Sequence, residues 1–158
     1  MTNGGVIMEI YTVSLFGHRH VSNPEKIRIE LKPLVEHLIQ EKQYIQFLIG
    51  HDGEFDEIAA EVISEAIRNS RFHTALLIMV LPYMRSEFYH KKKFRQYNQI
   101  QICPDSVIMP YREAFFTRNR NMIDRSDTII CYLHSKSGGT FRAADYAVSR
   151  NRNLIYLD

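Results

Sequence analysis

The sequence predicts an α/β fold in which a doubly wound, mainly parallel β-sheet carries helices on both faces. Three observations support this prediction. Short apolar runs alternate with segments of helical periodicity, the runs are nearly continuous, as in strands buried on both faces, and the first three end at loops containing glycine or proline. Because a chain of 158 residues has the usual size of one domain, we interpret residues 1–158 as a single domain.

The predicted strands are short and rich in isoleucine, leucine and valine. Five are expected, at Ile10 to Phe16, Tyr44 to Ile49, Ala75 to Leu81, Thr128 to Leu133, and Leu154 to Leu157. A further short strand is expected at Ser106 to Met109.

Helical spacing separates these strands. The first helix should begin at Asn23, a helix-capping residue followed by Pro24, and Pro33 should kink it or delay its restart. Two more amphipathic helices are expected around Ile58 to Ala66 and Ala143 to Val148, and Met84 to Tyr97 is a candidate for another.

Composition restricts the function only weakly. A formal net charge of +2 does not predict a nucleic-acid partner, and the basic run from His90 to Arg95 is interpreted as a solvated face. Cys131 lies in an apolar run, as a packed thiol would, which favours a reducing compartment. Met1 to Met8 has no leader pattern and no apolar run reaches membrane-spanning length, so we expect a cytoplasmic protein without a membrane partner.

Two loops that follow predicted strands contain candidate ligand-binding residues. Gly17-His18-Arg19 follows the first strand, where glycine permits a tight exit and both side chains could meet a phosphate or a base. The segment from Gly50 to Asp56 follows the second strand and leads into a helix. Gly50 and Gly53 permit close approach of a ligand, and Asp56 could cap the helix or accept a hydrogen bond from a sugar hydroxyl. No ligand spacing supports a metal site.

The third loop, Ser135 to Thr140, gives the clearest signal. Gly138-Gly139-Thr140 lies between an apolar strand and an alanine-rich helix, which is how a backbone cradle for phosphate is built. A plain turn with a helix cap is the alternative. The loop lacks the nucleotide-triphosphate and dinucleotide fingerprints.

Arg118 to Asp124 concentrates guanidinium, amide and carboxylate groups before the Thr128 strand. Arginine suits phosphate binding, and a solvated helix end is the alternative. Asn121 and Asp124 are candidate site residues from this segment.

Four motifs in chain order resemble the SLOG superfamily, and in particular its small stand-alone bacterial members, over nearly the whole chain. They are Gly17-His18-Arg19, Phe47 to Gly50 with Gly53, Phe55 and Asp56, Arg120 to Asp124, and Gly138-Gly139-Thr140 with Tyr146-Ala147. The resemblance implies a Rossmann-like fold and a pocket for a nucleotide or a nucleotide-derived, ADP-ribose-like ligand. Relatives include DprA and the LONELY GUY phosphoribohydrolases. The latter place a pair of glutamates after the Gly-Gly-Gly-Thr segment, whereas Phe141, Arg142 and Ala143 follow Thr140 here.

The leading hypothesis is therefore a module that binds or senses a nucleotide-like small molecule without a cofactor. The alternative is an enzyme that acts on an N-glycosidic bond, as a phosphoribohydrolase or a deoxyribosyltransferase-like protein, with Asp56 or Asp124 as the catalytic group. An interaction protein with a decayed ligand site is a third reading, and a homo-oligomer is left open. The predicted ligand-binding residues are Gly17, His18, Arg19, Gly50, Gly53, Phe55, Asp56, Asn121, Asp124, Ser137, Gly138, Gly139 and Thr140.

Overall fold

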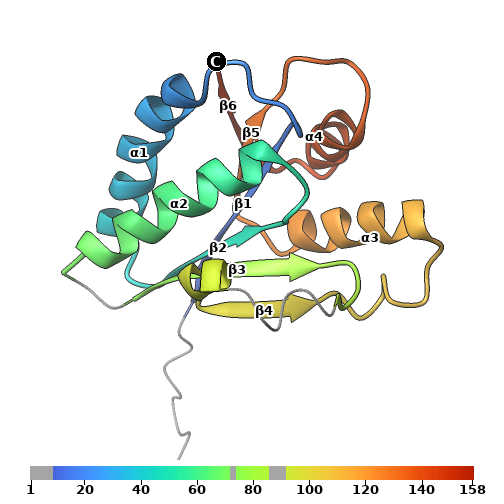
Figure 1. Cartoon of the computed structure of the whole chain (residues 1–158), viewed down its shortest axis with the longest axis horizontal. Coiled ribbons are helices and arrows are strands. Elements are labelled where there is room, and N and C mark those ends of the chain that lie inside the picture. Colours follow the sequence, from blue (N-terminus) through green and yellow to red (C-terminus); the bar gives the residue numbers. More distant parts are fainter. Residues whose placement is uncertain (1–8, 72–73, 86–91) are drawn as a thin grey trace, which may run out of the picture.

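The computed structural model describes residues 9–71, 74–85 and 92–158. Its centre is a six-stranded sheet in which every pair of neighbouring strands is parallel (Figure 1). The strands are β1 (Tyr11–Gly17), β2 (Ile45–Ile49), β3 (Ala75–Leu81), β4 (Gln99–Ile102), β5 (Thr128–Tyr132) and β6 (Asn153–Leu157). The five main predicted strands are thus confirmed to within one residue at each end.

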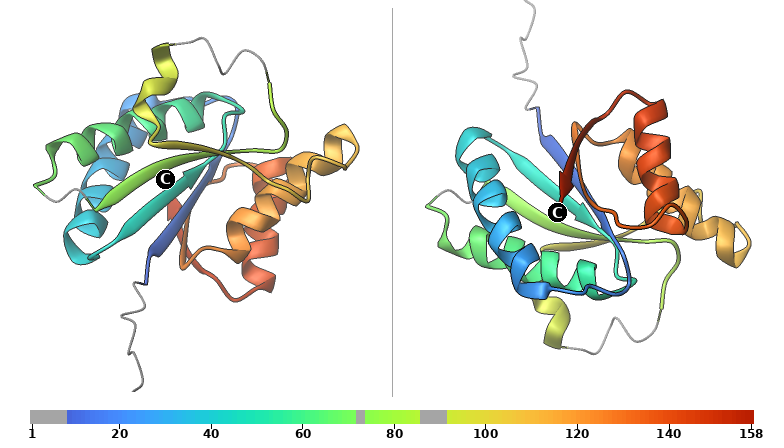
Figure 2. Two further views of the ribbon diagram at one scale, coloured as in Figure 1. Left: turned by 90° about the horizontal axis from the view of Figure 1, so that it is seen from below. Right: turned by 90° about the horizontal axis from the view of Figure 1, so that it is seen from above.

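Among the described residues, four α-helices and a short 3-10 helix cover the sheet. They are α1 (Pro24–Glu41), α2 (Glu54–Asn69), α3 (Tyr111–Asp124), α4 (Gly139–Ser149) and the 3-10 helix η2 (Lys92–Gln96). The pair α1 and α2 lies on one face, and the pair α3 and α4 on the other (Figure 2). The expected α/β architecture with helices on both faces is therefore confirmed.

The four central strands, β1, β2, β3 and β5, are buried on both faces because successive residues enter different cores. In β1, Leu15 belongs to the core under α1 and α2, and its neighbour Phe16 to the core under α3 and α4. In β2, Phe47 and Leu48 divide in the same way. This explains why the strands read as continuous apolar runs rather than as alternating ones.

The start of α1 confirms the predicted cap, because the Asn23 side chain accepts a hydrogen bond from the Lys26 N–H at 3.2 Å and Pro24 occupies the first turn. The late restart that was one of the two expectations for Pro33 is wrong, since α1 continues through Pro33 to Glu41, and the kink stays a prediction. The Pro33 ring is exposed, as is Ile29 one turn earlier. The Ile29 carbonyl, which lacks a helical donor, therefore lies on the side of α1 that faces water.

Two predictions for the middle of the chain are wrong or only partly tested. Ser106 to Met109 is not a strand but a series of turns, in which the Ser106 hydroxyl donates to the Pro82 and Cys103 carbonyls. The strand in this region is β4, which pairs with β3. Within Met84 to Tyr97, the described part contains only the 3-10 helix η2, and residues 86–91, including His90 and Lys91 of the basic run, lie outside the described residues.

The strand order β4-β3-β2-β1-β5-β6 places the reversal of the chain at β1. The loop after β1 leads to α1 on one face, and the loop after β5 leads to α4 on the other. Ligands of doubly wound sheets bind outside the carboxyl ends of the strands at such a reversal. No helix among the described residues is long and apolar enough to cross a membrane.

Candidate ligand site

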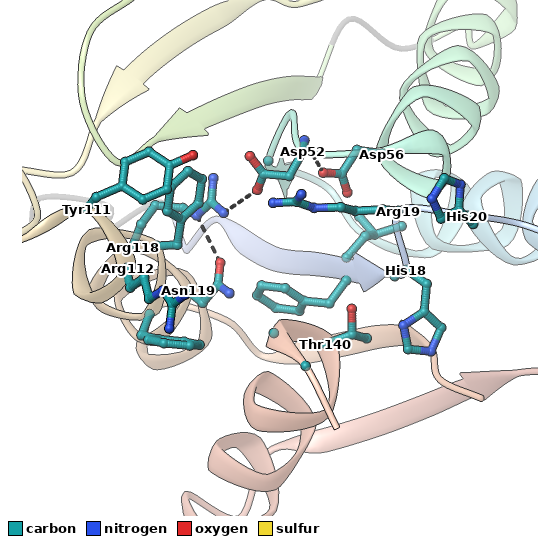
Figure 3. Close-up of a pocket in the computed structure, with 18 residues that line it drawn as sticks. His18, Arg19, His20, Asp52, Asp56, Tyr111, Arg112, Arg118, Asn119 and Thr140 are labelled. Atoms are coloured by element: carbon teal, nitrogen blue, oxygen red, sulfur yellow. Dashed lines mark hydrogen bonds and ion pairs between the residues drawn. The ribbon is translucent and has the colours of Figure 1, made fainter. Parts of the chain in front are cut away.

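A cavity of about 700 Å³ opens at the carboxyl ends of β1 and β2, between the loops that follow them and the helices α3 and α4 (Figure 3). Eight of the thirteen predicted residues line it: Gly17, His18, Arg19, Gly50, Asp56, Gly138, Gly139 and Thr140. Three loops that are far apart in the sequence therefore meet at one cavity. Gly53, Phe55, Asn121, Asp124 and Ser137 are not among its lining residues.

Gly53 joins two loops rather than facing the cavity. A β-carbon at Gly53 would lie 2.4 Å from the Arg19 Cα, so only glycine allows the two backbones to come this close. The Glu54 N–H donates to the Arg19 carbonyl at 2.9 Å, and the Phe55 N–H to the His18 carbonyl at 3.4 Å. The loop after β1 thus occupies the first free N–H groups of α2, which are then unavailable to a ligand.

Phe55 packs beneath Gly17, one of the residues that line the cavity. It is fully buried, stacks on the Tyr132 ring at 5.9 Å and leaves no space for a side chain at Gly17, whose β-carbon would lie 2.0 Å from the Phe55 Cγ. Gly17 therefore permits the packing of β1 on α2. Phe55 thus contacts residues that line the cavity without lining it itself.

The N-terminus of α4 is open, in contrast to that of α2. Gly138 precedes the helix with a φ of +91°, a left-handed conformation that favours glycine, and no side chain caps the helix. Within the described part of the chain, the N–H groups of Gly139 and Thr140 have no hydrogen-bond acceptor, and no atom lies within 4 Å of a β-carbon built on Gly139. This first turn therefore offers backbone donors and the positive end of the helix dipole to the cavity.

A buried arginine that the sequence analysis did not select holds the cavity wall together. Arg118 on α3 is only 2% exposed, donates to the Val80 carbonyl at 3.0 Å and pairs with Asp52 at 2.5 Å. Its Nε donates to the Asn119 side-chain oxygen at 2.9 Å, and its NH1 lies 2.9 Å from a β-carbon built on Gly50. Gly50 is therefore needed to admit this guanidinium, each nitrogen of which donates to a protein group.

Asp56 is the most strongly perturbed acid in the cavity. It is 8% exposed and accepts a hydrogen bond from the Asp52 N–H at 2.9 Å. Burial, with a smaller contribution from the Asp52 carboxylate, raises the pKa of Asp56 to about 7. Near neutral pH its carboxyl is thus divided between protonated and ionised forms, whereas Asp52 is balanced by Arg118.

Exposed cationic and aromatic groups lie at the mouth of the cavity. Arg19 and Arg112 are exposed, and no carboxylate lies within 4.0 Å of either among the described residues. Tyr111 packs against Phe115 with ring centroids 5.2 Å apart, and Phe116 also lines the wall. The site therefore combines anion-binding groups with ring faces on which a base could stack.

His18 contributes a largely neutral imidazole at the edge of the cavity. Its Nε2 accepts a hydrogen bond from the His134 N–H at 2.8 Å, which ties the loop after β1 to the loop after β5. Burial, together with the nearby His134, lowers the pKa of His18. No three His, Cys, Asp or Glu side chains within residues 9–71, 74–85 and 92–158 are arranged to share a metal ion.

The remaining predicted residues lie elsewhere. Asp124 accepts hydrogen bonds from the Tyr146 hydroxyl at 2.9 Å and pairs with Arg150 at 3.2 Å. Asn121 accepts a long hydrogen bond of 3.4 Å from Arg125, and Ser137 bonds within its own loop to Ser135.

Comparison with known proteins identifies the fold. No protein family model matches the chain, and no similar sequence is found among curated proteins. DNA processing protein A from Helicobacter pylori, solved for its single-stranded DNA binding mode, superimposes with a TM-score of 0.64 and 21% identity over 92% of this chain and 64% of that one. The X-ray structure of TM1055, a structural genomics target, gives a TM-score of 0.56 and 11% identity over 91% of this chain and 72% of that one.

The chain has a Rossmann-like fold. The fold that the sequence motifs led us to expect is confirmed, since both solved structures share it at low sequence identity. This chain spans less than two thirds of the Helicobacter pylori protein, so the activity of that whole protein does not extend to it by similarity.

Proposed function

We propose that this protein binds a nucleotide or a nucleotide-derived, ADP-ribose-like ligand in the cavity at the carboxyl ends of β1 and β2. The observation that carries the proposal is the open N-terminus of α4, where, among the described residues, the N–H groups of Gly139 and Thr140 have no acceptor and no atom lies within 4 Å of a β-carbon built on Gly139. Such a terminus favours a phosphate or another anion.

The rest of the cavity suits the other parts of a nucleotide. Arg19 and Arg112 supply positive charge at the mouth, the rings of Tyr111 and Phe115 offer stacking faces, and the Asp56 carboxyl can bond to a sugar hydroxyl. The volume of about 700 Å³ lies within the range of small-molecule sites. These features support the assignment of phosphate, base and ribose to different walls.

Calorimetric titration with AMP, ADP and ADP-ribose tests the proposal. Gly139→Val places a branched side chain in the open space above α4 and should abolish binding, while Arg19→Ala should weaken binding by about 1.5 to 3 kcal/mol, the worth of a hydrogen bond to a charged group. Arg95→Ala, an exposed arginine on η2, is the matched control and should bind like the wild type. Unchanged affinity in a folded Gly139→Val variant would place the phosphate elsewhere.

An oligodeoxynucleotide belongs in the same titration because the Helicobacter pylori protein binds single-stranded DNA. The net charge of +2 and a cavity of about 700 Å³ favour a small molecule here. If an oligonucleotide bound much more tightly than every mononucleotide and its binding fell steeply with salt, nucleic acid would replace the small ligand in the proposal.

A second candidate function is hydrolysis or transfer at an N-glycosidic bond. Asp56 favours it, because this acid lies in the cavity with a pKa of about 7, close to that of an effective general acid or base. Asp124, the other candidate, does not line the cavity and is held by Tyr146 and Arg150. Catalysis would therefore depend on Asp56.

A further inference from the structure

A second, smaller hollow adjoins the cavity and takes no part in the function proposed above. This groove of about 260 Å³ runs between α3 and α4, and it shares Phe116 and Asn119 with the cavity. On α4, Gly139 and Thr140 line the cavity, and the next two residues, Phe141 and Arg142, line the groove. The cavity and the groove therefore adjoin each other along the start of α4.

Two arginines in the groove are stacked on aromatic rings. The guanidinium carbon of Arg142 lies 3.4 Å from the centroid of the Phe116 ring, and that of Arg120 lies 5.5 Å from the centroid of the Tyr146 ring. At 3.4 Å the Phe116 ring covers one face of the Arg142 guanidinium, and the Tyr146 ring lies within cation–π range of Arg120. Both side chains are thus held ready to bind an anion.

Neither arginine is neutralised by the protein. Among the described residues, no carboxylate lies within 4.0 Å of Arg120 or Arg142, whereas Arg118 pairs with Asp52 and Arg150 pairs with Asp124. The groove contains one acid, Asp145, against two cations. The charge of the groove therefore favours an anionic group.

We propose that the groove between α3 and α4 binds a second anionic group of the ligand, so that the preferred ligand is a nucleotide with phosphoryl groups at two separate positions. This inference rests on the proposed function, which places the first phosphate at α4. Arg142 follows Gly139 by three residues, which corresponds to about 4.5 Å along the helix axis. That span is within the reach of the two phosphates of a nucleoside 3′,5′-bisphosphate.

Titration of the full chain with adenosine 5′-monophosphate and with adenosine 3′,5′-bisphosphate tests the inference. The wild type should bind the bisphosphate at least about tenfold more tightly, a difference of about 1.4 kcal/mol. In the double variant Arg120→Gln, Arg142→Gln, this preference should fall below about twofold while the affinity for the monophosphate stays unchanged. Arg95→Gln, on the opposite face of the sheet beside α2, is the control and should keep the preference.

The outcomes separate this inference from the proposed function. Equal affinity of the wild type for both nucleotides, or equal weakening of both in the double variant, would overturn the second subsite and leave nucleotide binding intact. If neither nucleotide binds, the proposed function fails. The anion site in the groove is then tested separately, by following the NMR signals of the arginine Nε–H groups during titration with inorganic phosphate. Shifts at Arg120 and Arg142 without a shift at Arg95 support an anion site there, and unchanged signals overturn it.

Discussion

Replacing Gly53 with alanine should destabilise the fold, whereas the same change at Gly139 should not. Gly53 has an extended φ of −178°, which any residue can adopt, so the expected effect is steric and not conformational. The new methyl group would lie 2.4 Å from the Arg19 Cα. Ordinary contacts of a β-carbon lie at 3.4 to 4 Å, so one of the two backbones must move by about 1 Å.

The magnitude follows from the contacts that this movement disturbs. Overpacking of this kind costs about 1 to 3 kcal/mol. The hydrogen bonds from the Glu54 and Phe55 N–H groups to the Arg19 and His18 carbonyls contribute about 1 kcal/mol each and would be lengthened. Alanine stiffens the unfolded chain and returns about 0.4 to 1 kcal/mol. A net loss of about 2 to 3 kcal/mol is therefore expected for Gly53→Ala.

Urea unfolding monitored by circular dichroism measures both variants. Gly139→Ala, where the methyl group meets no atom within 4 Å and φ is not positive, should leave the free energy of unfolding unchanged or raise it by up to about 1 kcal/mol. If Gly53→Ala unfolded within about 0.5 kcal/mol of the wild type with the same denaturant slope, the close approach of the two loops would not be a constraint of the folded state.

Three further predictions concern the acids and the buried arginine. Because the pKa of Asp56 is raised from 3.8 to about 7, the folded state binds the Asp56 proton more tightly than the unfolded state does. The unfolding free energy of the wild type relative to that of Asp56→Asn should therefore fall as pH rises from about 4 to 7. A difference between the two proteins that is the same at pH 5 and pH 8 would contradict this. Arg118→Met should cost about 3 kcal/mol or more in unfolding free energy, because the partly buried Asp52 loses its counter-ion, and Asp52→Asn in the same background should recover part of the loss. In a base-release assay, common nucleoside monophosphates should give little or no turnover. The reason is that Phe141, Arg142 and Ala143 stand where the LONELY GUY phosphoribohydrolases, which the sequence motifs resemble, carry glutamates. Robust base release that disappears in Asp56→Asn would favour the hypothesis of an N-glycosidic enzyme.

The strand pattern could be predicted because burial on both faces leaves a clear apolar signal. The prediction of strands from apolar runs failed at β4, where Gln99 and Gln101 alternate with isoleucines at the edge of the sheet and Ile100 is 38% exposed. The apolar run at Ser106 to Met109 misled the prediction, because Ile108 is 84% exposed and the Ser106 hydroxyl holds the backbone in turns. Apolar content alone does not distinguish an exposed loop from a strand.

The glycine loops could be found from the sequence, but their roles could not. Gly17 and Gly53 are required by packing against Phe55 and Arg19, and a sequence does not show such approaches between distant loops. Gly139, in contrast, faces open space.

The contribution of α3 to the cavity was missed because this segment was not assigned to a helix. At helical spacing, Tyr111, Phe115 and Arg118 fall on one face and Asn121 and Asp124 turn away from it. The start of α3 after Pro110 was the signal that could have predicted this division. If this helix had been predicted, Arg118 would have replaced Asn121 and Asp124 among the predicted site residues.

Two walls of the cavity, the loop after β1 and the loop before α4, should differ in mobility because only the first is anchored to a helix. This loop is fixed to α2 through the carbonyls of His18 and Arg19, and the Val21 N–H donates to the Glu54 carboxylate at 2.6 Å. The loop before α4 is exposed, and its Ser137 N–H bonds only within the loop, to Ser135. Amide hydrogens at Val21 and Glu54 should therefore exchange slowly with solvent and those of Ser137 and Gly138 rapidly. The wall formed by the loop after β1 should therefore be the more rigid of the two.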